Sequence, residues 1–371
     1  MPVGGPLFEA TANLLAIEAG LALYGFIVVT EGKDGASENR SETKNRSTLT
    51  LRHLCAEKLM IREEDGSDSN HYTEHELPWD LPLAHPHPSV KDVIIVQSGD
   101  APHTIKKMRN SIELSGKEDS NRNLHLNGLP IQLRMAKDVW ERCPDATAGT
   151  SSQIMLYPKL SREVFDLTAK TRMRTGLAAH AQGPSVAKMI VDYRHTNTER
   201  AGDGAYDSYL LHCVNTNYWF DVMNANYSKG CSFINSADHQ HVYDLLDYVK
   251  YHTLWKNSVS ANEYFPRSTY EDVCWSSLGP ALLAILYLPK HPGHNIMQSR
   301  LGSDVCEKSF CFKRGANMNA NALGTNQILA SFGGGPLNEI WASRKANFQK
   351  RRTFRADELL LGKLKRIKLD K

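Results

Sequence analysis

The chain has 371 residues, which is enough for two or three domains. Its hydrophobic content of 41% is ordinary for a globular protein, so a sizeable core is expected. The formal net charge is only +3, which excludes a uniformly basic nucleic-acid-binding chain.

Positive charge is concentrated near the C-terminus. Residues 344–371 contain eleven Lys or Arg against three Asp or Glu. Such a segment is typical of nucleic-acid contact or nuclear import, and equally of a solvated tail. Both interpretations stay open.

The seven cysteines are irregularly spaced and none forms a CxxC pair. This pattern argues for reduced thiols in a cytosolic or nuclear protein and against a zinc finger in this chain. No signal peptide follows Met1, and the longest apolar run, residues 278–288, is too short to span a bilayer. We therefore expect a nuclear protein with no membrane partner.

The predicted elements begin with short apolar strands between helices. Residues 8–22 predict a helix and residues 26–29 a buried strand. Residues 31–46 predict a loop that opens into a helix, and a further helix falls within residues 48–61. The proline- and histidine-rich residues 63–88 predict a loop. Residues 93–96 then predict a second buried strand, and a helix starts within residues 100–110.

The pattern beyond residue 110 is mostly helical. Helical segments are expected over residues 131–141, 161–191, 238–255, 278–288 and 304–313, with a polar break at 119–127 and a turn at 291–295. A Gly-Gly-Gly-Pro run at residues 333–336 ends the ordered core. The organisation is α/β at the N-terminal end and mostly α across the middle.

Acidic residues follow both predicted strands. Asp34 comes soon after the first strand and Asp100 soon after the second. Neighbouring strands can bring two such carboxylates to one sheet edge, where they could hold Mg²⁺ and act on a phosphodiester. Asp304 and Glu307 form a further acidic pair at i, i+3 on a helix. By spacing alone, turn, capping or solvated acids explain these positions more readily.

Short motifs change this balance. They are DGASENR at residues 34–40, SGDAPHTIKKMRN at 98–110, KLS at 159–161 with RMR at 172–174 and LAA at 177–179, FDVMN at 220–224, LGSDVCEKSF at 301–310 and RGAN at 314–317. In the same order, they resemble the DGAxxNR, DxPHxxKxxRN, KL[ST]…KMxVxLA, FDxxN, LSxDxxExxF and RxGxN segments of P-element and THAP-domain type DNA transposases. The last motif is one residue shorter here.

The resemblance implies an α/β fold in which a partial RNase H-like core is interrupted by a large, mostly α-helical insertion. In that family the core binds Mg²⁺ through Asp, Asp and Glu, and the insertion binds GTP. Asp34 then corresponds to the second catalytic Asp and Glu307 to the closing Glu, so both are expected metal ligands. Asp304 and Asp100 are the further catalytic candidates.

The cofactor-binding candidates lie in the expected insertion. The resemblance places Asp221 and Asn224 in its guanine-binding region, and Lys106 is a further cofactor-binding candidate. With Lys107 and Arg109, Lys106 could contact phosphate, but an exposed basic helix face explains the three cations equally well. No GxxxxGK[ST] motif occurs, so a GTP site would not be a P-loop.

The expected domains are residues 1–100 as the N-terminal part of the core, 101–290 as the insertion, 291–332 as the C-terminal core helix and 333–371 as the basic tail. The family pattern also needs a first Asp on an opening strand and an N-terminal zinc finger, and neither precedes Asp34. We therefore expect a truncated chain without strand-cleaving activity, because such metal ligands act as one unit.

These observations predict a transposase-derived protein with DNA and GTP as partners and homo-oligomerisation as an open alternative. In the intact family, Mg²⁺ would support DNA cleavage and strand transfer. One rival is a domesticated, non-catalytic scaffold that binds DNA or protein. Another is a guanine-nucleotide-binding module that uses the helical insertion alone.

Overall fold

The computed structural model describes residues 6–23, 27–33, 37–60, 72–143, 157, 159–196, 204–225 and 233–302. The helix predicted over residues 304–313 and the basic C-terminal segment lie outside these ranges. Within them, the mixed α/β class expected from the sequence is confirmed.

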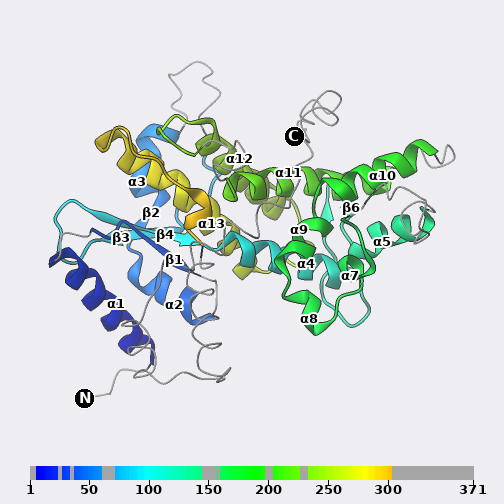
Figure 1. The fold of residues 1–371 in the computed structure, drawn as a ribbon, viewed down its shortest axis with the longest axis horizontal. Coiled ribbons are helices and arrows are strands. Elements are labelled where there is room, and N and C mark those ends of the chain that lie inside the picture. Colours follow the sequence, from blue (N-terminus) through cyan, green and yellow to red (C-terminus); the bar gives the residue numbers. More distant parts are fainter. Residues whose placement is uncertain are drawn as a thin grey trace, which may run out of the picture. The chain divides into compact units, whose positions relative to one another are not determined.

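A four-stranded sheet forms the N-terminal part of the fold (Figure 1). Its strand order is β1-β4-β3-β2, with β1 at Thr30–Lys33, β4 at Ile94–Gly99, β3 at Pro82–Pro86 and β2 at Leu49–Thr50. The β1–β4 pair is parallel, and the β4–β3 and β3–β2 pairs are antiparallel.

Helices lie on both sides of this sheet. α1 (Pro6–Leu23) and α2 (Ser37–Arg46) are on one side, and α3 (Leu51–Leu59) and α13 (Arg267–Tyr287) are on the other (Figure 1). This cover explains why the last five residues of β4 are all buried, rather than every second one.

The first strand lies four residues after its predicted position. The apolar residues 26–29 were expected to form it, yet β1 covers Thr30–Lys33 and Ile27 is 52% exposed. Pairing starts where the Val96 amide donates to the Val29 carbonyl at 3.0 Å and then continues along β1. The prediction was wrong because β1 is a polar strand whose Glu31 and Lys33 form an ion pair at 3.2 Å.

The loop predicted over residues 63–88 contains a strand, β3. Both of its prolines stand at the ends of the strand, where a missing amide N–H is tolerated. Between them, Ala84 and His85 pair with Val96 and Ile95 of β4. The prolines therefore led to a loop prediction for a segment that forms the strand between β4 and β2.

Helices form most of the remaining described chain. They are α4 (Ala101–Leu114), α5 (Leu133–Arg142), α7 (Arg162–Phe165), α8 (Ala169–Arg172), α9 (Thr175–Ala181), α10 (Pro184–Thr196), α11 (Asp207–Met223) and α12 (Gln240–Ser258). Short 3-10 turns lie at Gly204–Tyr206, Leu288–Lys290 and Gln298–Arg300, and β5 (His125–Leu126) pairs with β6 (Leu129–Pro130). The helices predicted over residues 8–22, 131–141, 238–255 and 278–288 are confirmed as α1, α5, α12 and the second half of α13.

Two parts of the helical region differ from expectation. Residues 161–191 form four helices instead of one stretch, because the Thr168 side chain caps a new helix and Pro184 begins another. Helix α11 and the β5–β6 hairpin were not predicted from the sequence. The hairpin turns at Asn127 and Gly128, whose φ values of 53° and 75° suit a two-residue turn.

Helix α13 packs closely on β4 because a glycine lies on each side of the contact. A methyl group on Gly99 would come within 2.8 Å of the Ser276 amide nitrogen. One on Gly279 would come within 2.9 Å of the Gln97 carbonyl oxygen. Larger side chains at either position would therefore push the helix off the strand.

The stretch Arg267–Lys290, which contains α13, is long and apolar enough to cross a membrane. Most of it, 83% of its most apolar window, is buried inside the protein. Burial of this kind identifies α13 as a core helix of the described fold.

A second part of the core holds two fully buried histidines. The His212 Nε2 lies 3.0 Å from the Gln182 Oε1, and the His252 Nδ1 lies 2.7 Å from the Tyr264 hydroxyl. Burial lowers the pKa of His212 to about 3. Burial, followed by the nearby His212, lowers the pKa of His252 well below its ordinary value. Both imidazoles are therefore neutral in the folded protein at neutral pH.

We predict that Gly279→Ala destabilises the protein by about 1–3 kcal/mol, because the methyl group overpacks the α13–β4 contact. The matched control is Gly20→Ala in α1, where nothing lies within 4 Å of the added methyl group. The control should stabilise by about 0.5–1 kcal/mol through helix propensity. Urea unfolding measures both changes, and a stabilising Gly279→Ala would contradict the close packing.

We also predict that stability falls as the pH drops below about 6.5, the ordinary histidine pKa. The unfolded chain binds protons at His212 and His252 there, whereas the folded protein does not until much lower pH. Each such histidine costs up to about 1.4 kcal/mol per pH unit. Unfolding at pH 7.5 and 5.5 should show a smaller loss for His212→Gln than for the parent protein. Equal losses would show that His212 titrates normally.

Candidate functional site

The carboxyl ends of β1 and β4 lie side by side. Lys33 is in register with Gly99, and the Asp100 amide donates to the Lys33 carbonyl oxygen at 2.9 Å. The two strands that precede Asp34 and Asp100 are therefore neighbours, as expected, although the first strand covers Thr30–Lys33 and not residues 26–29. Asp34 is the next residue after Lys33 and lies outside the described residues.

A third chain segment reaches the same sheet edge. A methyl group on Gly32 would lie 2.8 Å from the Leu301 carbonyl oxygen, and one on Gly302 would lie 2.7 Å from Oδ1 of Asp100. The chain at residues 301–302 thus passes directly over the ends of β1 and β4. Asp304 and Glu307 follow this segment in sequence and lie outside the described residues.

Asp100 is buried at this edge, at the N-cap position of α4. Its side chain makes no capping hydrogen bond, and its Oδ2 instead contacts Nδ1 of His103. Its carbonyl oxygen accepts from the His103 and Thr104 amides at 3.1 and 3.0 Å. The positive end of the helix dipole favours a carboxylate here. Asp100 is therefore a fixed, oriented acid at the meeting point of three segments.

Two consecutive acids of α13 form ion pairs with the helices α2 and α4. Glu271 pairs with Lys44 of α2 at 2.8 Å, and Asp272 pairs with Lys107 of α4 at 2.7 Å. α2 and α4 are the helices that follow β1 and β4, so α13 fixes both strand–helix units. These two acids were not predicted as site residues. Their position within an apolar helix is nevertheless a usable signal, because buried acids need cationic partners.

The three cations of the α4 motif have different roles. Lys107 is paired as described above, so it is not a freely exposed cation. Arg109 is fully buried and donates to the Arg172 and Thr171 carbonyl oxygens at 2.7 and 3.4 Å. Burial, and then the charge of Arg172, lowers the pKa of Arg109 to about 10. The interpretation as an exposed basic face is wrong for Arg109 and Lys106, which are both buried.

The cofactor-binding candidates lie on two helices. Lys106 is on α4 and has no ion-pair partner in the described part of the chain. Asp221 is exposed on α11 and accepts from Asn217 at 3.0 Å. Asn224 follows α11 and donates to the Phe220 carbonyl at 2.7 Å. These contacts are ordinary within a helix, so GTP binding at these residues stays a prediction.

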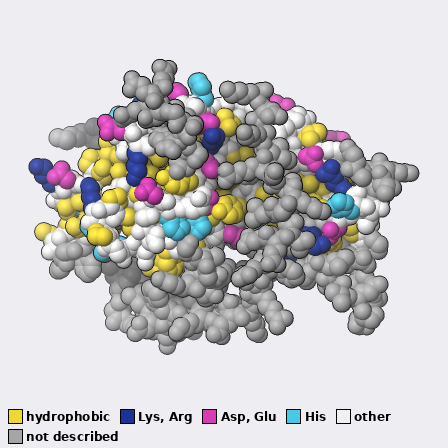
Figure 2. All heavy atoms as spheres, turned by 90° about the horizontal axis from the view of Figure 1, so that it is seen from above, with side chains coloured by type: hydrophobic (Ala, Val, Ile, Leu, Met, Phe, Trp, Pro, Cys, Tyr) yellow, Lys and Arg dark blue, Asp and Glu magenta, His cyan; other side chains and the backbone are white. Residues whose placement is uncertain are grey.

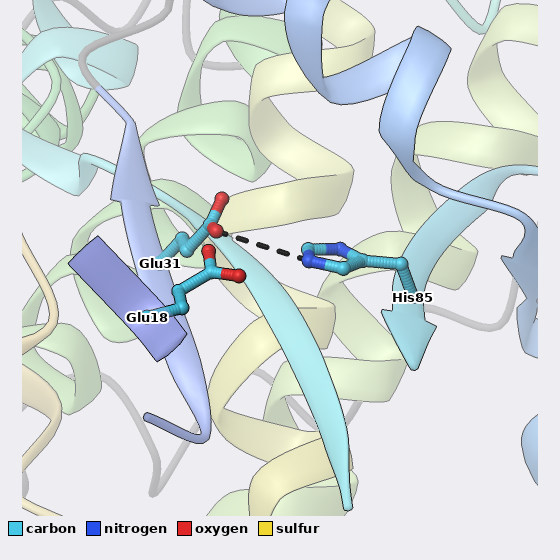
Figure 3. Close-up of side chains that lie close together, drawn as sticks. All are labelled: Glu18, Glu31 and His85. Atoms are coloured by element: carbon cyan, nitrogen blue, oxygen red, sulfur yellow. Dashed lines mark ion pairs between the residues drawn. The ribbon is translucent and has the colours of Figure 1, made fainter. Parts of the chain in front are cut away.

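A cluster of possible metal ligands, Glu18, Glu31 and His85, lies between α1 and the sheet (Figure 3). Their ligand atoms lie within 4.8 Å of one another. However, the Arg46 guanidinium lies 2.7 Å from Glu18, 2.7 Å from Glu31 and 2.8 Å from His85. A metal ion would need the same atoms at about 2.0–2.2 Å. Arg46 therefore fills the position that a metal would take.

The pKa values in this cluster follow from burial and from Arg46. Burial, with the neighbouring Glu31, raises the pKa of Glu18. Burial would also raise the pKa of Glu31, but hydrogen bonding to Glu18 and the charges of Lys33 and Arg46 lower it. Burial and the charge of Arg46 lower the pKa of His85 to about 4, so its ring is neutral. The cluster is a structural ion-pair network that attaches α1 to the sheet.

The sheet, its covering helices and the converging strand ends define a mixed α/β fold. No protein-family model and no curated protein matches the sequence. Among solved structures, the chain is similar to the Drosophila P element transposase strand transfer complex, with a TM-score of 0.57 and 17% identity. The match covers 82% of this chain, which spans 58% of the length of that chain. At this identity the likeness shows the fold.

We predict that Arg46→Met destabilises the protein by about 3–5 kcal/mol, because it leaves the buried carboxylates without their cation. The control is Arg52→Met, whose Glu74 and Asp80 partners are exposed, and which should cost at most about 1 kcal/mol. Urea unfolding compares the two. A rise in the melting temperature of the parent protein with Zn²⁺, absent in Glu18→Gln, would instead establish a metal site.

Proposed function

We propose that the chain is a transposase-derived protein that binds DNA, with the sheet edge at Asp100 as its metal-binding centre. One observation carries the proposal. The ends of β1 and β4 and the segment at residues 301–302 meet at a buried, oriented carboxylate. The fold likeness to a P element transposase strand transfer complex supports the same class of protein.

Asp100, together with the acids that follow Lys33 and Gly302 in sequence, would suit Mg²⁺, which takes oxygen ligands. Asp34 directly follows Lys33, and Asp304 and Glu307 follow Gly302 by two and five residues in sequence. We assign Asp34 and Glu307 as metal ligands, with Asp100 and Asp304 as further acids. Bound Mg²⁺ ions would activate the attacking oxygen and stabilise the leaving oxygen at a DNA phosphodiester.

In this proposal the sheet and its neighbouring helices are an RNase H-like core, and the helices between α4 and α12 are an insertion. We place the end of the insertion nearer Arg267 than residue 290. The reason is that α13 packs on β4, through Gly99 and Gly279, and not only on the preceding helices. α13 then returns the chain to the core edge through residues 298–302.

We predict that the full chain binds duplex DNA, as measured by fluorescence anisotropy, and that affinity falls with salt. Glu307→Ala and Asp100→Asn should leave this binding within about twofold, because a metal-site acid contributes to chemistry more than to backbone contact. The same reactions are run on a gel with and without Mg²⁺. The control is Asp92→Asn, an exposed acid in the turn before β4.

Mg²⁺-dependent cleavage that is lost in Glu307→Ala and kept in Asp92→Asn would establish the catalytic role. Binding without cleavage would agree with the sequence-based expectation of an inactive chain and favour the scaffold function. A chain that binds no DNA at any salt concentration would exclude both.

A further inference from the structure

A second charged feature lies at the other end of α4 from Asp100. It is formed by residues 159–174, which include α7 and α8, and is called here the α7–α8 surface. Arg172 of this surface pairs with Glu113 near the end of α4 at 3.0 Å. The 14 residues of α4 span about 20 Å at 1.5 Å per residue. The surface is therefore distinct from the sheet edge.

We infer that the α7–α8 surface contacts the phosphate backbone of duplex DNA. This inference rests on the proposed function and names the surface that would position the duplex. About six base pairs, at 3.4 Å each along one strand, would span the length of α4. A duplex held at the surface could thus also reach Asp100 at the sheet edge.

The α7–α8 surface carries a positive net charge. Residues 159–174 contain five cations and two acids, a net charge of +3 (5 − 2), which equals that of the whole chain. The cations are Lys159, Arg162, Lys170, Arg172 and Arg174, and the acids are Glu163 and Asp166. In the part of the chain coloured in Figure 2, seen from above, acidic and basic side chains lie close together.

Several cations of the α7–α8 surface are exposed and could contact a phosphate. Lys159 and Lys170 are exposed and have no carboxylate partner among the described residues. Arg174 pairs with Glu163 at 2.6 Å, but both side chains are more than half exposed. Exposed ion pairs of this kind contribute at most about 1 kcal/mol, so a phosphate can replace the carboxylate at little cost.

Hydrogen bonds hold the backbone of the α7–α8 surface in place. The buried Arg109 guanidinium lies beneath the surface and donates to the Arg172 and Thr171 carbonyl oxygens. The Thr168 side chain and the Thr171 side chain each bond the other's backbone amide in a capping box. The backbone that carries the cations is thus fixed before any partner binds, which reduces the ordering cost of binding.

Met173 adds an apolar contact to this surface. It is 66% exposed between Arg172 and Arg174, an unusual position for a large hydrophobic side chain. Arginines beside an exposed apolar side chain suit a DNA groove, where the charges meet phosphates and the apolar group meets sugars or base edges. The combination favours DNA over an acidic protein.

The test compares duplex DNA binding by the full chain, Lys170→Glu/Arg174→Glu and the control Lys58→Glu/Lys91→Glu. Both double variants change the net charge equally, and the control residues are exposed near the sheet, on α3 and before β4. Affinity is measured from about 50 to about 200 mM salt. Circular dichroism melting confirms that both variants fold.

The α7–α8 variant should bind at least about tenfold more weakly, and its plot of log affinity against log salt should be shallower by about 1.8, for two lost phosphate contacts. The control should keep the parent slope. If the parent binds DNA and both variants bind alike, this inference fails while the proposed function stands. If the parent binds no DNA, both fail. Binding to polyglutamate without binding to DNA would assign the surface to an acidic protein instead.

Discussion

The contact between α13 and β4 determines the geometry of the whole sheet edge. Gly99 on the strand and Gly279 on the helix let the two backbones approach closely, and the adjacent acids of α13 pair with Lys44 and Lys107. These two lysines belong to the helices that follow β1 and β4. One long helix, placed far along the sequence, thus fixes two strand–helix units and returns the chain to the strand ends. The position of Asp100 relative to residues 301–302 follows from this packing.

The charges buried in the fold separate into two kinds of environment. On one side of the sheet, Arg46 contacts Glu18, Glu31 and His85, so this cluster already has its cation and contributes to stability. At the sheet edge, Asp100 contacts His103 and lies at the start of α4, close to Lys33 and Gly302, which precede the other acids in sequence. Groups of acidic ligands therefore suggest a metal only when no protein cation fills the same position.

The proposed metal site and the proposed DNA-binding surface lie at the two ends of helix α4. Asp100 stands at the N-cap position of α4, and the α7–α8 surface lies against the other end of the helix, where Glu113 pairs with Arg172. In this proposal, helix α4 would set the distance between the metal site and the surface that contacts the DNA backbone. Such an arrangement suits a protein that holds a duplex along its length. Arg109, buried inside α4, fixes the basic surface and is not itself available to DNA.

The sequence by itself determined the mixed α/β class, the long amphipathic and apolar helices, and the order of motifs that resemble a transposase family. These features depend on local periodicity and short-range chemistry, which a sequence displays directly. It did not determine the polar strand β1 or the proline-bounded strand β3, because pairing with β4 stabilises both against their local propensity. Nor could it show that Glu271 and Asp272 are ion-paired to distant lysines, or that Arg46 occupies the Glu18–Glu31–His85 cluster. Those relations join residues far apart in the chain, and only tertiary packing brings them together.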